Sequence, residues 1–488
     1  MISLSFAQKE NIGFQYVMDA LQLNSPYGEE RARQLRPFAR EQKPELLRQL
    51  DNVRRVMEGE SACAADMGAM LRVFMTVKNV RPTAKRILEV PLNEIELFEI
   101  KRFLLKTEEM TAPFHKVQSV LALEGVTLLD TTPALDLLDP EHNRVAAFFI
   151  GDHYSKALQN IRRKKRELEE QLRRMGSGPE KEAVSQERLA VAVEEEQEEA
   201  RIREELTLAL RPYVPAMLRN METIADLDLT VEKAHLAQKY GGVYPVLTDS
   251  ELAMDDMVHP QISDVLESRG ARFTAVSIAL DRGAAVITGA NMGGKSVALK
   301  TIALNVLLTH CGFFPFAKTA KVPMFDGMYI ISEDLESIDR GLSSFGGEIV
   351  RFNQVIRDME GGFSFIILDE FARGTNPDEG AAIVQAVTQY LNGRNAVTVL
   401  ATHYDNVSQL GSFHYQVIGL KDLDVEALKK EIAQAGGEAG VELISKHMNY
   451  GLYRVEGRQD CPRDALNICR LLGMKEEIMD IVEKNYES

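Results

Sequence analysis

The segment that decides the fold of the carboxyl-terminal half is Gly289-Ala290-Asn291-Met292-Gly293-Gly294-Lys295-Ser296. It fits the pattern G-x-x-x-x-G-K-[ST], and it lies between residues 284–288, which predict a strand, and residues 297–308, which predict a helix. Glycines let the backbone wrap around phosphates with its N–H groups inward, and the helix amino terminus adds positive potential. We therefore predict a nucleotide phosphate-binding loop. Lys295 is expected to reach the β- and γ-phosphates, and the Ser296 hydroxyl is expected to hold Mg²⁺.

A second apolar run, Phe365-Ile366-Ile367-Leu368, ends in the carboxylates Asp369 and Glu370. Beside the phosphate loop, Asp369 is predicted to hold Mg²⁺ directly or through water. Glu370 is predicted to orient or deprotonate the attacking water. The run 396–401 predicts a further strand, which His403 closely follows. A lone histidine is more often structural, but the end of a strand of the same sheet is suited to sensing the γ-phosphate or the water.

The pattern of apolar residues differs between two parts of the chain. From about residue 281, short β-rich apolar runs alternate with amphipathic stretches, which predicts a parallel sheet with helices on both faces. Residues 1–150 instead carry apolar residues at helical spacing and predict a mainly helical part, with breaks at Pro91 and Pro113.

Residues 154–212 predict an antiparallel coiled-coil hairpin that turns at Gly176-Ser177-Gly178-Pro179. Its first arm is basic around Arg162–Arg166, and its second arm is rich in glutamate. The basic arm could contact DNA. Alternatively, the two arms neutralise each other and the hairpin is simply solvated, which the opposite charges favour.

The composition limits the possible functions. The 488 residues suggest roughly three domains. The net charge of −16 argues against a broad sequence-independent grip on DNA, because such binding depends on Lys and Arg at phosphates. No long apolar run predicts a membrane span, and no signal peptide is expected. The four cysteines have no metal-ligand spacing, so we expect reduced thiols in a cytoplasmic protein.

Several blocks, taken in order, resemble the MutS family. The run Thr288-Gly-Ala-Asn-Met-Gly-Gly-Lys-Ser296 resembles its P-loop, and Leu368-Asp-Glu-Phe-Ala-Arg-Gly-Thr-Asn-Pro-Asp-Glu-Gly380 resembles its Walker B segment and the loop after it. Ala401-Thr-His-Tyr404 is similar to its switch segment, and Gly341-Leu-Ser-Ser-Phe345 with Glu348 is similar to its signature segment.

The resemblance implies an ABC-type ATPase that binds and hydrolyses ATP with Mg²⁺. In that geometry two ATPase domains enclose two nucleotides, and Ser343 contacts the γ-phosphate held by the partner's P-loop. A homodimer, or a dimer with a close relative, is therefore expected. The resemblance implies that Glu370 and His403 are the catalytic residues, and Phe273 is the candidate for stacking on adenine. The P-loop residues are those expected to bind ATP, namely Gly289, Ala290, Asn291, Met292, Gly293, Gly294, Lys295 and Ser296, with Ser296 and Asp369 at the metal.

The same resemblance implies a domain plan. It comprises an all-helical core or lever domain (1–153), a clamp-like hairpin (154–212), a lever return and connector (213–250), the P-loop ATPase domain (251–435) and a helical dimerisation segment (436–488).

The sequence also departs from the family. A mismatch-repair MutS begins with a domain that inserts an aromatic wedge into DNA, whereas this sequence starts almost directly at the lever. Together with the acidic charge, this makes mismatch reading doubtful. A DNA-binding ATPase of the repair or recombination type is the first hypothesis. The alternative is a protein-remodelling ATPase, because short MutS-like chains of this kind are associated with reactivation of cobalamin-dependent aminomutases.

Overall fold

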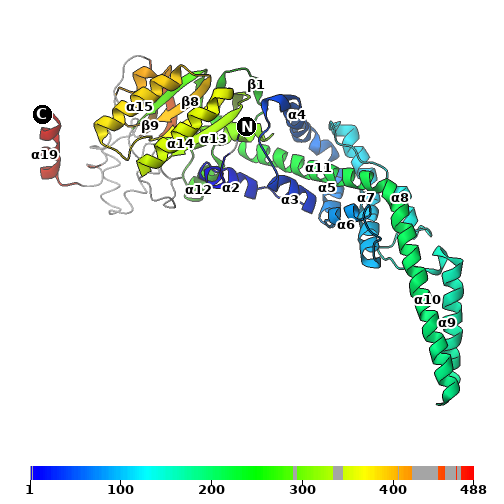
Figure 1. Cartoon of the computed structure of the whole chain (residues 1–488). Coiled ribbons are helices and arrows are strands. Elements are labelled where there is room, and N and C mark those ends of the chain that lie inside the picture. The colour runs from blue at the N-terminus through cyan, green and yellow to red at the C-terminus, as the bar shows by residue number, and fades with distance from the viewer. Residues whose placement is uncertain are drawn as a thin grey trace. The chain divides into compact units, whose positions relative to one another are not determined.

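The computed structural model describes residues 2, 4–289, 294–332, 344–404, 406–419, 449–456, 469 and 474–487. The chain divides into two compact units (Figure 1). A helical unit comprises residues 22–34 and 58–231, and an α/β unit comprises residues 1–21, 35–57 and 232–488. The domain boundaries expected at residues 153, 212, 250 and 435 differ from this division and stay predictions.

The helical unit confirms the mainly helical character expected for the first 150 residues. Its long helix α7 begins with a capping box in which Asn93 and Glu96 satisfy each other's backbone N–H groups. The helices of this unit are α3 (Pro26–Arg33), α5 (Ala64–Phe74), α6 (Arg81–Arg86), α7 (Glu94–Leu121), α8 (Thr132–Leu138), α9 (Lys156–Arg174) and α10 (Pro179–Leu210), together with parts of α4 (Lys43–Gly59) and α11 (Val214–Tyr240).

The break expected at Pro113 is wrong, because α7 continues through this residue to Leu121. Proline removes one backbone hydrogen bond and usually ends or kinks a helix. Here Met110, Phe114 and Val117 are all buried around the proline. Burial of this apolar face on both sides outweighs the local cost of the missing hydrogen bond.

A six-stranded sheet forms the centre of the α/β unit, in the order β10-β9-β4-β8-β7-β6. All neighbouring strands pair in parallel except β10, which runs antiparallel to β9 at the edge. The predicted parallel sheet is thus confirmed, with one antiparallel strand that the pattern did not predict. The strands are β4 (Gly283–Thr288), β6 (Gly327–Ser332), β7 (Ser364–Asp369), β8 (Ala396–Ala401), β9 (Phe413–Gly419) and β10 (Asn449–Arg454).

Helices cover both faces of this sheet, as predicted. Alternate strand residues such as Ile287 and Val399 pack with α13 (Lys295–His310) in one buried cluster. Their neighbours Val286 and Leu400 pack in a second cluster with α14 (Ser344–Asp358) and α15 (Pro377–Asn392). Successive side chains along each strand therefore pack into cores on opposite faces of the sheet. Because both faces are buried, the sequences of these strands are continuous apolar runs.

A second, four-stranded sheet in the same unit was not foreseen from the sequence. Its order is β1-β5-β2-β3, and only β1 and β5 pair in parallel. The strands are β1 (Val246–Thr248), β2 (Leu252–Met257), β3 (Val276–Leu280) and β5 (Thr319–Pro323), and the remaining helices of the unit are α1 (Phe6–Asn11), α2 (Phe14–Asp19), α12 (Pro260–Ser268) and α19 (Glu476–Glu487). None of the helices that the structure describes combines the length and apolar character needed to cross a membrane.

Candidate functional site

The candidate site lies at the carboxyl edge of the six-stranded sheet, where β4 ends and α13 begins. Gly289 and Gly294 have φ angles of 152° and 95°, which non-glycine residues rarely adopt. A Cβ atom on Gly294 would overlap the ring of Tyr450. Both positions therefore require glycine, as the loop pattern predicts. Residues 290–293, which include Ala290, Asn291, Met292 and Gly293, lie outside the described residues.

Lys295 and Ser296 connect the start of α13 with the end of β7. The Lys295 ammonium group is nearly buried, donates to the Gly289 carbonyl at 2.9 Å and lies 3.4 Å from Glu370 Oε1. The Ser296 hydroxyl donates to Asp369 Oδ1 at 3.2 Å. A hydroxyl beside a carboxylate is an oxygen donor set that suits Mg²⁺, and the buried ammonium suits phosphate oxygens. These residues fit a magnesium nucleotide.

The two carboxylates at the end of β7, Asp369 and Glu370, have different surroundings. Asp369 is the last residue of the strand, aligned with Ala401 of β8. Glu370 has a φ of 49°, in the left-handed region, and its N–H donates to the Ala401 carbonyl at 3.0 Å. Such a conformation costs on the order of 1–3 kcal/mol and is held only by its surroundings. It directs the Glu370 side chain between Lys295 and Arg373, whose Nη1 donates to it at 2.7 Å.

His403 follows β8 and is half-buried close to these charges. Burial lowers its pKa, and the nearby Glu370 carboxylate opposes part of this shift. Its Nδ1 is buried and has no hydrogen-bond partner among the described residues. A neutral imidazole with an unused polar atom can accept or donate a proton when a ligand enters.

The expected adenine-stacking residue has a second aromatic ring beside it. The rings of Phe273 and Tyr450 are stacked, with centroids 6.2 Å apart and an interplanar angle of 18°. Tyr450 belongs to β10 and also contacts Gly294 of the phosphate loop. Sequence reasoning missed Tyr450, because no motif surrounds it and only the antiparallel edge strand brings it here.

Two further buried contacts at the site also escaped sequence reasoning. The Thr288 hydroxyl, at the entrance to the phosphate loop, lies 2.8 Å from His414 Nε2 of β9. Glu348 of α14 accepts from the Ala372 N–H at 2.8 Å, and Ala372 also has a positive φ, of 61°. Helix α14 is thereby tied to the segment after Glu370. Ser343 lies outside the described residues.

The hairpin helices α9 and α10 pair their charges with each other. Arg162 contacts Asp152, Glu195 and Glu199 within 2.9 Å, and Lys165 also contacts Glu195. The carboxylates hold the Arg162 pKa above its ordinary value despite the opposing effect of burial. Much of the basic arm is thus neutralised within the chain, as the second interpretation of this hairpin expects.

The fold and the site together have the arrangement of a P-loop domain, with a strand, a glycine-containing loop and a helix at the carboxyl edge of a largely parallel sheet. Residues 285–466 match the family model described as MutS domain V, which is an ABC-type ATPase domain. The chain is 33% identical over 263 residues to "Endonuclease MutS2" of Geobacillus sp. (strain WCH70) and 28% identical over 290 residues to the protein of that name from Levilactobacillus brevis. It is also 30% identical over 210 residues to "DNA mismatch repair protein MutS" of Fusobacterium nucleatum subsp. nucleatum.

These alignments cover 52%, 59% and 42% of this chain, and 33%, 34% and 23% of the relatives. The matched part therefore spans about a third or less of the relatives' own length. Over residues 285–466 and the aligned segments, the chain is therefore similar to proteins of the MutS family.

Proposed function

We propose that this chain binds ATP with Mg²⁺ at the β4–α13 loop, hydrolyses it to ADP and phosphate, and uses the cycle to control a grip on DNA. The observation that carries the proposal is the convergence of Lys295, Ser296, Asp369, Glu370 and His403 at one sheet edge.

Each of these residues has one role in the proposed reaction. Lys295 exchanges its contacts with Gly289 and Glu370 for phosphate oxygens. Ser296 and Asp369 hold Mg²⁺, whose charge offsets that of the phosphates. Glu370, released from Lys295, orients and deprotonates water, and His403 senses the γ-phosphate.

The base is proposed to lie on the aromatic pair of Phe273 and Tyr450. Their rings are 6.2 Å apart between centroids, so an adenine either stacks on one outer face or separates the two rings. Tyr450 already contacts Gly294, and a shift of its ring would therefore connect base binding with the phosphate loop.

A complete site is proposed to need two chains, with Ser343 of one chain reaching the nucleotide of the other. The chain carries one P-loop and one signature segment, which is consistent with a homodimer or a dimer with a close MutS-like relative. The contact between Glu348 and the Ala372 N–H connects α14, which follows Ser343, with the segment next to Glu370.

DNA is the proposed client because the relatives carry the names "Endonuclease MutS2" and "DNA mismatch repair protein MutS". The self-neutralised hairpin favours a second candidate, a client protein such as a cobalamin-dependent aminomutase that the ATPase remodels. Steady-state ATPase activity at low salt, with and without homoduplex, mismatched and branched DNA, separates the two. Turnover that changes with DNA supports the first, and turnover indifferent to every DNA supports the second.

A further inference from the structure

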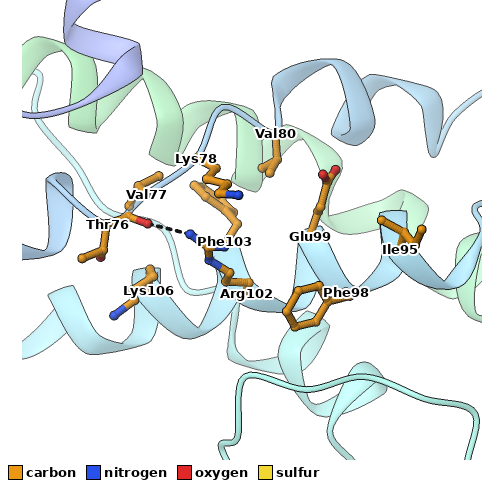
Figure 2. A pocket seen from close by; sticks show the side chains of 10 residues that line it. All are labelled: Thr76, Val77, Lys78, Val80, Ile95, Phe98, Glu99, Arg102, Phe103 and Lys106. Carbon is orange, nitrogen blue, oxygen red and sulfur yellow. Dashed lines mark hydrogen bonds between the residues drawn. The ribbon is translucent and has the colours of Figure 1, made fainter.

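A pocket in the helical unit lies among residues that have no part in the nucleotide site. It opens between α7 and the loop that follows α5, and its cavity volume is about 190 Å³ (Figure 2). Val77, Val80 and Phe103 form a buried floor, while Ile95 at the opening is 72% exposed. An apolar cavity of roughly 150 Å³ holds a molecule of benzene, so this pocket accommodates one large aliphatic side chain.

The rim of this pocket carries three cationic side chains although the chain as a whole carries −16, and one of them, Lys106, is paired with Glu109 at 2.6 Å. Lys78, Arg102 and Lys106 line it, together with the single carboxylate Glu99. Arg102 donates to the Thr76 carbonyl at 3.1 Å, which ties the loop to α7 (Figure 2). In the part of the chain that the structure describes, Lys78 makes no ion pair. The pocket therefore fits a partner that combines an aliphatic side chain with carboxylates.

The same unit presents a stripe with the complementary chemistry on α10. Leu189 and Val193 are 62% and 48% exposed and lie four residues apart, on one face of the helix. Glu182 and Glu196 continue this face, at seven and three residues from the apolar pair. Both carboxylates are exposed and form no ion pair within the described ranges. Helix α9 packs elsewhere on α10, through buried residues such as Val191.

We propose that the α7 pocket of one copy receives the α10 stripe of a second copy. Leu189 enters the pocket, Val193 covers Ile95, and Glu182 and Glu196 face the cationic rim. One contact thereby accounts for two apolar surfaces that are otherwise unpartnered, and it can form twice in a symmetric dimer. It is a contact of the helical units and does not depend on nucleotide.

A photocrosslinker tests the location of the contact. In nucleotide-free protein, Ile95→p-benzoylphenylalanine is expected to give a two-chain product in which mass spectrometry finds an α10 peptide of the second copy. This substitution is compatible with folding because Ile95 is exposed. Crosslinks only to other segments, or none between chains, would overturn the proposal.

A charge exchange tests the chemistry, with sedimentation equilibrium as the readout. Lys78→Glu/Lys106→Glu and Glu182→Lys/Glu196→Lys are each expected to weaken self-association about tenfold, and a chain with all four changes is expected to recover it. Lys85→Glu/Lys116→Glu is the matched control, since both lysines are exposed outside the pocket.

Failure of the four-residue variant to recover self-association would overturn the proposed contact. So would a pocket variant that loses duplex DNA binding while its self-association stays unchanged. The Lys295→Ala chain is expected to keep this contact, so its test is separate from that of the ATPase.

Discussion

The Lys295 ammonium group is held by one backbone carbonyl and one carboxylate at a position that is only 3% exposed. A buried cation is costly unless it is paired, so both contacts stabilise the site before nucleotide enters. The same pairing keeps Glu370 occupied. At the scale of single residues, the Lys295 cation is thus paired with Glu370, the proposed base. Binding of phosphate to Lys295 would separate the two side chains.

We expect Lys295→Ala to weaken ATP binding by on the order of a hundredfold, because a buried charge pair is worth about 2–5 kcal/mol when one partner is removed. Titration with a fluorescent ATP analogue measures this loss. Lys300→Ala, on the same helix, is the control and should bind as the original chain does. Undiminished binding or turnover by Lys295→Ala would reject the phosphate-loop assignment.

Glu370→Gln keeps the shape of the side chain but removes its basicity. We expect ATP binding to remain while turnover falls by on the order of 10³-fold, within the range found for general bases. Single-turnover kinetics separates these two effects. Glu379→Gln, an exposed change in the first turn of α15, is the matched control. A turnover rate for Glu370→Gln near that of the control would assign the base elsewhere.

At the scale of elements, the two arms of the hairpin α9–α10 differ in which of their charges are available. Arg162 is held by three carboxylates, whereas the exposed neighbour Arg163 donates to the Asn160 side chain and forms no ion pair with any residue that the structure describes. A guanidinium that already has partners contributes little to the salt-dependent attraction of DNA.

If the hairpin contacts DNA, Arg163→Gln should therefore weaken DNA binding more than Arg162→Gln does. We expect Arg162→Gln instead to destabilise the hairpin by about 1–3 kcal/mol, because it removes the ion pair of the partly buried Glu199 and one of the two ion pairs of Glu195. Fluorescence anisotropy with labelled duplex DNA at several salt concentrations, together with thermal melts, measures both effects. A larger DNA defect in Arg162→Gln would contradict the self-neutralised hairpin.

Two buried histidines make the α/β unit sensitive to acid. Burial lowers the pKa of His259 and of His310 to about 4. These histidines are therefore protonated at a much lower pH in the folded state than in the unfolded chain. The unfolding free energy should therefore fall as pH decreases below about 6.5, by about 2 kcal/mol per histidine by pH 5. Urea denaturation at pH 7.5 and pH 5 tests this. His259→Gln should remove about half of the fall, and an equal pH dependence in both chains would contradict the account.

At the scale of the whole molecule, the proposed ATPase is a property of two chains. Lys295→Ala and Ser343→Ala should each be nearly inactive alone, because each disables one half of every composite site. In an equal mixture half of the dimers contain one of each, and one of their two sites is intact. ATPase assays of the mixture should therefore recover about a quarter of the original activity. If the mixture stays as inactive as its components, the site is complete within one chain.

The nucleotide loop could be predicted because its chemistry is contiguous in sequence. Three strands and the helix α13 followed from runs of apolar residues, and the glycines preceded the Lys295-Ser296 pair in a fixed pattern. The roles of these residues remain predictions that the variants above test. The prediction of a helix break at Pro113 was wrong, because tertiary burial of the turns on both sides outweighs the local preference of proline to end a helix.

The sequence by itself determined the strand–loop–helix unit, the two carboxylates at the end of a second strand, and the opposite charges of the two hairpin arms. Only the tertiary structure decided that Tyr450 stacks on Phe273, that His414 contacts Thr288 and that Glu348 contacts the Ala372 N–H. The physical reason is that periodicity and local motifs specify elements within one stretch of chain. Contacts between elements instead depend on the strand order of the sheet, which places β9 beside β4, more than a hundred residues away in sequence, and β10 beside β9.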